Sequence, residues 1–451
     1  MEKIIKTKNR LILTKIPAPG TNKIFKNIQK YESRSMHGQI PIAWSKAKNF
    51  NIFDIAGNKF IDFTSTIFVS NTGHSNPRIK KYIQTSLKNN FLHSYAYIHK
   101  LREKYLKKLV KFSGNGLEKA FLMSAGTEAT EAAFKLMRMY GKNQKKRKLG
   151  IICFEGNWHG RTMASQMMSG NKKQSEWIGY HDKNIHHIPF PFPWKTNEKN
   201  AEKFLENSLK NLKKKINLKK DVCGVMFETF QGWGAIFYPL KYVQLFAKIC
   251  KKNNILIAFD EMQAGFGRTG ELFGYMNYDV EPDILACGKG SSSSLPLSIV
   301  LGRSEIMDLP EIGSMSSTHS ANPLVCAAGL ANLEALIEDG LIKNSRNLGK
   351  VFHEKLNVLL KRFPNYVSSV QGTGLLAAVI FVNQKGEPLS KLCDLISEKC
   401  LQTGLLVVHT GRESIKLAPP LVINEEELNE GVDTFLDAVD KSINELYGSQ
   451  H

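Results

Sequence analysis

The middle of the chain alternates between short apolar runs and helical patterns. Continuous apolar runs occur at residues 120–123, 149–154, 222–227, 255–259, 284–286 and 297–301. Patterns with a helical period separate several of them. Strands that are apolar on both faces are typical of a parallel sheet that helices cover on both sides. We therefore expect an α/β domain with a mainly parallel central sheet flanked by helices.

The flanking segments have a different pattern. Residues 51–63 predict two short strands around an Ala-Gly-Asn turn, after an irregular arm. Beyond Pro323, a long helix to about residue 339, strands near 375–381 and 405–409 and an acidic helix from near Glu425 predict a smaller α+β domain.

These patterns divide the chain into an expected set of domains. We expect an N-terminal arm and part of the small domain at residues 1–85, a large domain at 86–322 and a C-terminal small domain at 323–451. A chain of 451 residues, 42% of them apolar, is long enough for two such cores.

The chain is strongly basic, with a formal net charge of +21 and a pI near 9.5. Such a charge favours the hypothesis that the protein binds nucleic acid or a membrane surface. The lysines are scattered, however, and form only short clusters, at Lys145-Lys146-Arg147-Lys148 and between Lys213 and Lys220. No nucleic-acid-binding module accompanies them, so we expect a solvated surface and no nucleic-acid partner.

Cysteine spacing and hydropathy exclude other classes of protein. The seven cysteines are spread singly, without a pair at metal-binding spacing, which predicts reduced thiols and no metal site. No run of 18 apolar residues is present, so we expect no membrane span and a cytoplasmic enzyme. Residues 1–30 contain few acids, which leaves a targeting presequence open.

An acid and a lysine in the predicted sheet region suggest a particular chemistry. The run at 255–259 ends in Asp260, and Lys289 follows later in a Cys-Gly-Lys-Gly-Ser segment. Pyridoxal phosphate needs a carboxylate against its ring nitrogen and a lysine that holds its aldehyde as a Schiff base. Taken alone, the pair also fits an ordinary strand-end acid and a lysine in a solvated turn.

A strand-to-helix junction offers an anion site. The segment from Met123 to Ala133 follows a predicted strand and opens a helix, with Ala125, Gly126 and Thr127 at its start. Free backbone amides and the helix dipole favour an anion such as a phosphate ester there. The alternative is that Thr127 only caps the helix.

Three further segments contain candidate ligands. Trp158 could stack on a flat ring and Arg161 could bind a substrate carboxylate through its two-pronged guanidinium group, unless this is an exposed loop with a packed tryptophan. Gln263, in a glycine-rich run after Asp260, could donate to a phenolic oxygen of the cofactor. Ser317 and Thr318 could bind phosphate or could belong to a linker that caps the helix at Pro323.

The order of these segments resembles the class III aminotransferases, a branch of the fold-type I pyridoxal-phosphate enzymes. The resemblance rests on Gly73-His74-Ser75-Asn76-Pro77, Gly126-Thr127, the segment from Trp158 to Arg161, the run from Asp260 to Gly270, Lys289 and Ser317-Thr318. It implies that Lys289 and Asp260 are catalytic and that pyridoxal 5'-phosphate is the cofactor. It also implies cofactor contacts from Ala125, Gly126, Thr127, Trp158, His159, Glu228, Gln263, Ser317 and Thr318.

The same resemblance implies a homodimer with shared active sites, since the family's Thr-His segment reaches phosphate across a dimer interface. Glu228 ends the run at 222–227 and is expected beside the cofactor pocket, where it would steady its neighbours. The alternative for Glu228 is a plain strand-end acid.

Two departures from the family pattern concern the substrate. In members that alternate between an ω-amine and glutamate, an arginine before the late Pro-Pro pair forms an ion pair with a glutamate. Lys416 stands at the arginine position and Trp233 at the glutamate position. Lysine does not reproduce bidentate carboxylate binding and Trp233 adds an apolar wall, so we expect no glutamate switch here.

We therefore expect a transaminase that moves an amino group from an ω-amino acid, diamine or amino-sugar-like donor to a 2-oxo acid such as pyruvate. Arg161, Trp233 and Lys416 are its candidate substrate contacts. An aminomutase, racemase or decarboxylase with the same cofactor stays open, and so does a non-catalytic interaction protein on the same fold.

Overall fold

The computed structural model describes residues 4–114, 116–144 and 148–448. Lys145, Lys146 and Arg147 of the first basic cluster therefore lie outside the described residues. The chain forms two compact units. The first joins residues 1–76 with 343–451, and the second comprises residues 77–342.

These boundaries differ from the expected ones at 85/86 and 322/323. The helix α12 (Pro323–Glu338), expected to open the small domain, packs instead on α3 (Pro77–Lys88) and α4 (Lys100–Phe112) of the second unit. The apolar residues of a helix show that it is buried but not against which partner. Here α12 buries residues over most of its circumference, as expected for a helix enclosed by its neighbours.

The second unit is built on a seven-stranded sheet in the order β6-β14-β13-β12-β9-β7-β8. In that order the strands are Lys119–Met123, Ser298–Gly302, Ile284–Cys287, Leu256–Asp260, Val222–Glu228, Gly150–Phe154 and Ile185–Ile188. The strands from β13 to β8 run parallel, whereas β14 is antiparallel to both of its neighbours. The mainly parallel sheet predicted from the six apolar runs is confirmed. The seventh strand, β8, was missed because two histidines interrupt its apolar pattern.

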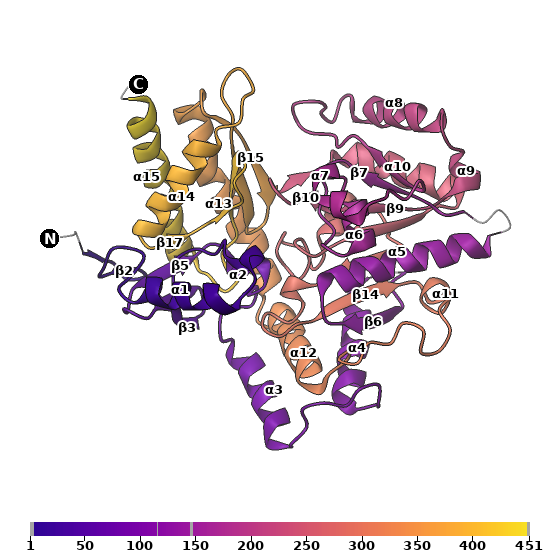
Figure 1. The fold of residues 1–451 in the computed structure, drawn as a ribbon, viewed down its shortest axis with the longest axis horizontal. Coiled ribbons are helices and arrows are strands. Elements are labelled where there is room, and N and C mark those ends of the chain that lie inside the picture. Colours follow the sequence, from indigo (N-terminus) through magenta and orange to yellow (C-terminus); the bar gives the residue numbers. More distant parts are fainter. Residues whose placement is uncertain (1–3, 115, 145–147, 449–451) are drawn as a thin grey trace. The chain divides into compact units, whose positions relative to one another are not determined.

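Helices cover both faces of this sheet (Figure 1), with α5 and α6 on one side and α8 and α10 on the other. Besides α3, α4 and α12, the helices of the unit are α5 (Gly126–Asn143), α6 (Met163–Met168), α7 (Lys172–Ser175), α8 (Ala201–Lys213), α9 (Leu218–Asp221), α10 (Leu240–Asn253) and α11 (Ser304–Met307). Short 3₁₀ turns occur at Glu176–Ile178, Gly274–Tyr278 and Lys289–Ser291, and a small hairpin joins β10 (Phe230–Gln231) to β11 (Ile236–Phe237).

The two faces of the sheet are packed differently. Small residues of α5, such as Ala129 and Ala133, pack with Cys153 and Ala258 of the strands. Because side chains alternate along a strand, the next positions face the other way. There, aromatic rings pack together between the strands and α10: Phe154, Phe227, Tyr238, Tyr242 and Phe246. The strand ends are therefore held between two tightly packed layers.

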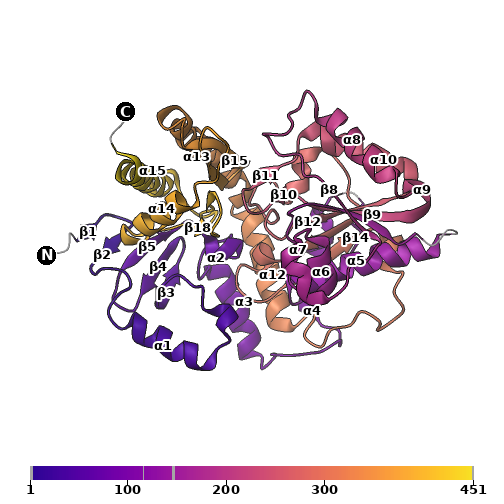
Figure 2. The same cartoon turned by 45° about the horizontal axis from the view of Figure 1, so that its top comes forward.

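The first unit contains two sheets (Figure 2). One has the order β1-β2-β5-β4-β3, with β17 beside β5; these strands are Ile5–Lys6, Leu11–Ile12, Lys59–Asp62, Asn51–Asp54, Trp44–Lys48 and Leu405–Leu406. The other has the order β15-β16-β19-β18, with bounds Val367–Thr373, Leu376–Phe381, Ser414–Leu417 and Val408–His409. The helical segments are α1 (Thr21–Tyr31), η1 (Arg34–Met36), α2 (Ser65–Phe68), α14 (Ser390–Gln402) and α15 (Glu425–Tyr447), while α13 (Leu341–Arg362) begins at the boundary between the units.

The strands predicted within 51–63, 375–381 and 405–409 are present, and so is the helix from Glu425. Asn424 caps that helix and Glu427 returns the bond to the Asn424 amide, which explains why it begins at this point. All seven cysteines are free and buried. Within the described ranges, no helix is long and apolar enough to cross a membrane, and no group of acids, histidines and cysteines is placed to hold a metal ion.

We expect Gly431→Ala to destabilise the first unit. A Cβ at Gly431 would lie 2.2 Å from Cζ of Phe63, whose ring is fully buried and packed edge-to-face on Phe352. Overpacking of this kind costs about 1–3 kcal/mol, of which the helix preference of alanine recovers up to ~1 kcal/mol. Urea unfolding measures the difference. Gly38→Ala is the matched control, since nothing lies within 4 Å of a Cβ built there. A Gly431→Ala protein at least as stable as the wild type would contradict the packing.

Candidate active site

The candidate site lies where parallel strands of the second unit end. Asp260 and Glu228 end β12 and β9 and are register partners, and Asp260 also pairs with Ala286 of β13. Lys289 follows β13 within a 3₁₀ turn, and its pKa is affected by the charges of both Asp260 and Glu228. The acid and the lysine that the sequence singled out therefore face one another at one edge of the sheet.

The environment of Lys289 favours its neutral form. Burial lowers the pKa of the Lys289 amine below its usual value, and the carboxylates of Asp260 and Glu228 partly oppose this. Only the neutral amine can attack an aldehyde or accept a proton, and a lowered pKa makes that form more accessible. The backbone at Lys289 has a φ of +40°, a strained conformation for a residue with a side chain, of the kind found at functional sites.

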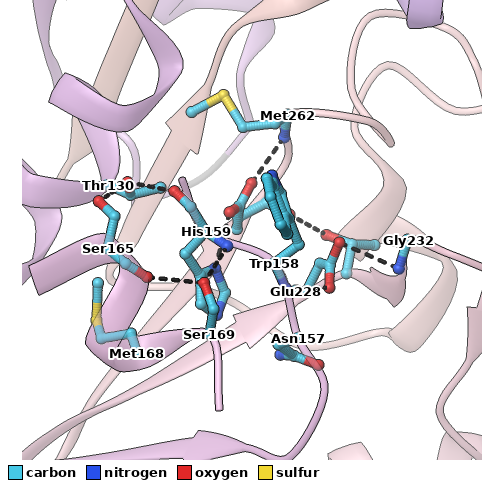
Figure 3. A network of polar contacts seen from close by, with 12 residues as sticks. Thr130, Asn157, Trp158, His159, Ser165, Met168, Ser169, Glu228, Gly232 and Met262 are labelled. Carbon is cyan, nitrogen blue, oxygen red and sulfur yellow. Dashed lines mark hydrogen bonds and ion pairs between the residues drawn. The ribbon is translucent and has the colours of Figure 1, made fainter. Parts of the chain in front are cut away.

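Asp260 is fixed by groups on both of its oxygens (Figure 3). Nδ1 of His159 donates to Oδ2 at 2.8 Å, and the Met262 amide donates to Oδ1 at 3.0 Å. His159 is itself buried, its amide donates to Ser169 and its carbonyl accepts from Thr130. His159 therefore serves to orient Asp260 rather than to face solvent.

Glu228 connects three segments at the same edge. Its Oε2 accepts from the Trp158 amide at 3.0 Å, and its Oε1 accepts from the Gly232 amide at 3.1 Å and from Nε2 of Gln263 at 3.5 Å (Figure 3). Charge-assisted bonds of this kind hold loops firmly. Glu228 thus joins the Trp158 loop, the turn at Gly232 and the segment of Gln263. The guanidinium carbon of Arg161 lies 4.6 Å from the Trp158 ring centroid, so the two side chains stack.

The N-terminus of α5 lies beside the Asp260 loop. A Cβ at Gly126 or at Gly288 would approach Sδ of Met262 to 2.8 or 2.6 Å, so these backbones and Met262 are in close contact. The first amides of a helix have no partner within it, which makes this end suitable for a phosphate. The Glu128 carboxylate accepts from the Ala125 amide, and Thr127 hydrogen-bonds to Thr162.

The remaining predicted residues are less closely connected to this cluster. Thr318 is exposed and its carbonyl hydrogen-bonds to His93, and no hydrogen bond in the described part of the chain joins Ser317 or Thr318 to Asp260 or Lys289. Lys416 is a buried residue of the first unit, with its ammonium nitrogen 5.0 Å from the ring centroid of Phe68. Trp233 is half-buried and donates its indole N–H to Oε1 of Gln231 at 2.6 Å.

Sequence reasoning missed Glu261, a fully buried acid next to Asp260. Its carboxylate accepts from the Thr229 hydroxyl and from the amides of Gly274 and Tyr275. Burial raises the pKa of Glu261 to about 7, although these donors favour the ionised form. The sequence signal was the Asp-Glu pair itself. These bonds hold the loop after β12 in place. None of them joins Glu261 to Lys289.

Comparisons with known proteins agree with this arrangement. The model of the family "Aminotransferase class-III" matches residues 32–439. Ornithine aminotransferase of Saccharomyces cerevisiae is 33% identical over 91% of this chain and 96% of its own length. A 4-aminobutyrate aminotransferase of Mycobacterium leprae is 28% identical over 94% and 97%. A transaminase structure from the marine bacterium Virgibacillus has a TM-score of 0.85 at 25% identity, covering 94% of this chain and all of that one.

The chain belongs to the class III aminotransferases. It is accordingly a pyridoxal-phosphate-dependent aminotransferase of fold type I, as the sequence predicted. The residues present fit that cofactor: a buried acid oriented by a histidine, a lysine with a lowered pKa and an open helix N-terminus lie together.

We expect Lys289 to become reactive at a lower pH than exposed lysines. Only the neutral amine reacts with trace acetic anhydride, and burial lowers the pKa of Lys289. Competitive labelling across pH, read by peptide mass spectrometry, should give a lower half-labelling pH for Lys289 than for exposed Lys172. In Glu228→Gln a charge that raises this pKa is lost, so the half-labelling pH should fall further. Equal values for the two lysines would contradict the assigned environment.

Proposed function

We propose that this aminotransferase moves an amino group from an ω-amino acid, diamine or amino-sugar-like donor to a 2-oxo acid such as pyruvate, by a ping-pong mechanism. The single observation that supports the chemistry best is the placement of Lys289 against both Asp260 and Glu228 at one sheet edge. The names of relatives that act on ornithine, acetylornithine and 4-aminobutyrate support an ω-amine as donor.

Each residue has a proposed part in this reaction. When bound, pyridoxal phosphate supplies an aldehyde that takes up amines and a ring that withdraws electrons from the reacting carbon. Lys289 would hold that aldehyde and would move the proton at the substrate carbon. Asp260, oriented by His159, keeps a proton on the ring nitrogen.

The other candidate contacts would position the cofactor. Ala125, Gly126 and Thr127 would hold the phosphate at the start of α5, and Ser317 and Thr318 would add a second grip from a neighbouring subunit. Trp158 would cover the ring and Gln263 would donate to its phenolic oxygen, with Glu228 holding the backbone of Trp158 and the side chain of Gln263. Because Ser317 and Thr318 would come from a neighbouring subunit, these assignments require a homodimer that shares its active sites.

Arg161 is the proposed carboxylate contact for the 2-oxo acid. Stacking on Trp158 leaves the in-plane N–H groups of the guanidinium available for a bidentate pair. Lys416 and Trp233, at the positions of the family's arginine and glutamate, support an enzyme that does not alternate with glutamate through that ion pair. We propose a cytoplasmic location and no nucleic-acid partner.

Lys289→Ala should abolish turnover. Loss of the residue that binds the aldehyde and moves the proton is expected to cost at least roughly 10²–10⁴-fold in rate. The assay is alanine formation from pyruvate with a panel of amines, and Lys172→Ala is the control for the loss of a lysine. Formation of one keto or aldehyde product per alanine separates transamination from an aminomutase, racemase or decarboxylase, which need no stoichiometric 2-oxo acid. Turnover retained in Lys289→Ala would refute the assignment.

Arg161→Lys should raise the KM for pyruvate by roughly 10–100-fold, because one or two charge-assisted hydrogen bonds of about 1.5–3 kcal/mol are weakened. The rate of the first half-reaction with an amine that has no carboxylate should stay within about threefold of the wild type. Single-turnover kinetics of both half-reactions measure these values. An equal loss in both would show that Arg161 acts on the cofactor loop instead.

A further inference from the structure

An aromatic cluster lies beside the candidate site, and only one of its members, Trp233, has been considered so far. It consists of Phe192, Trp194 and Trp233, called here the aromatic wall. Phe192 and Trp194 stack at 4.5 Å with an interplanar angle of 8°, and Trp233 is tilted by 53° to both rings at 6.2 and 6.4 Å. The side chain of Trp194 is 57% exposed, which is unusual for so large an apolar surface.

The aromatic wall stands at the catalytic edge of the sheet. Phe192 and Trp194 follow the end of β8, and Trp233 follows the end of β9, where Glu228 stands. Parallel strands place their carboxyl ends along one edge, so these rings continue the row formed by Lys289, Asp260 and Glu228.

Trp233 is tied to the cofactor contacts by its neighbours. A Cβ at Gly232 would lie 2.2 Å from Nε2 of Gln263 and 2.5 Å from Oε1 of Glu228, so the backbone before Trp233 touches both side chains. The Trp233 indole N–H is donated to Gln231, whose amide group donates to the Glu155 carbonyl at the start of the Trp158 loop. Glu228 thus holds both the amide of Trp158 and the backbone that precedes Trp233.

The chemistry of this surface is apolar. The Trp233 N–H is already engaged with Gln231, and the residue stands where relatives with a glutamate switch have an acid. At its outer end, the nitrogen of Lys195 lies 5.4 Å from the Phe192 centroid. Rings of this kind gain affinity by covering apolar or aromatic groups and by edge or offset stacking.

We propose that the aromatic wall binds an apolar or aromatic tail of the amine donor, with Trp233 as the residue that determines this specificity. The proposal rests on the proposed function, since it assumes that an amine reacts at Lys289. Trp194 and Phe192 extend the surface for the part of the tail beyond Trp233. Arg161 then serves the carboxylate of the 2-oxo acid, and the aromatic wall serves the apolar part of the donor.

The test compares two amines in the same holoenzyme, 3-phenylpropylamine and n-propylamine, with pyruvate as acceptor. The ratio of their kcat/KM values cancels differences in folded or cofactor-loaded fraction. The wild type should prefer the phenyl compound by at least roughly tenfold. Trp233→Ala and Trp194→Ala should each lower this ratio by roughly 3–10-fold, and Trp233→Phe should restore most of it. Trp177→Ala, which removes an exposed tryptophan bonded to Gln166, is the matched control.

Each outcome decides one question. A wild-type ratio near one, or an unchanged ratio in both Trp233→Ala and Trp194→Ala while propylamine still reacts, overturns the aromatic wall and leaves the aminotransferase intact. A ratio that falls equally in Trp177→Ala also overturns it. Failure of the wild type to react with any amine, when Lys289 carries the cofactor, refutes the proposed function instead.

Discussion

The parallel register of β9, β12 and β13 is the constraint on which the site depends. It sets Glu228 directly beside Asp260 and brings the chain to Lys289 after the next strand. Two buried carboxylates side by side repel one another, and burying them without hydrogen-bond donors is costly. The structure meets this cost with donors to every oxygen involved: His159 and Met262 at Asp260, and backbone amides and Gln263 at Glu228. The Lys289 amine adds a group whose positive form both acids favour.

Packing on the two faces keeps this register rigid. Alanines let α5 lie close to one face, so that its N-terminus reaches the backbone around Gly288 through Met262. On the other face, stacked and edge-to-face rings fill the space under α10. Because side chains are closely packed against both faces of the sheet, its strands have little room to shift. The loops after the strands can then differ between enzymes while the strand ends that carry the acids stay fixed.

Sequence reasoning predicted those parts of the molecule that local patterns specify. The six central strands, the strands within 51–63 and the helix from Glu425 follow from apolar periodicity and capping residues. Asp260 and Lys289 could be paired because parallel strands end at one edge. The partner of α12, the strand at Ile185–Ile188 and the contact of Trp194 with Trp233 could not be predicted, because each depends on residues distant in the chain. The resemblance supplied His159, but only coordinates give it the task of holding Asp260.

The two cations proposed as substrate contacts share a physical feature, since each lies beside an aromatic ring. Arg161 lies over the Trp158 ring and Lys416 over the Phe68 ring, at 4.6 and 5.0 Å from the centroids. A cation–π contact is worth about 0.5–1 kcal/mol when exposed and ~2 kcal/mol or more when desolvated. Such a contact stabilises a cation and leaves the edge of the charged group able to accept an anion.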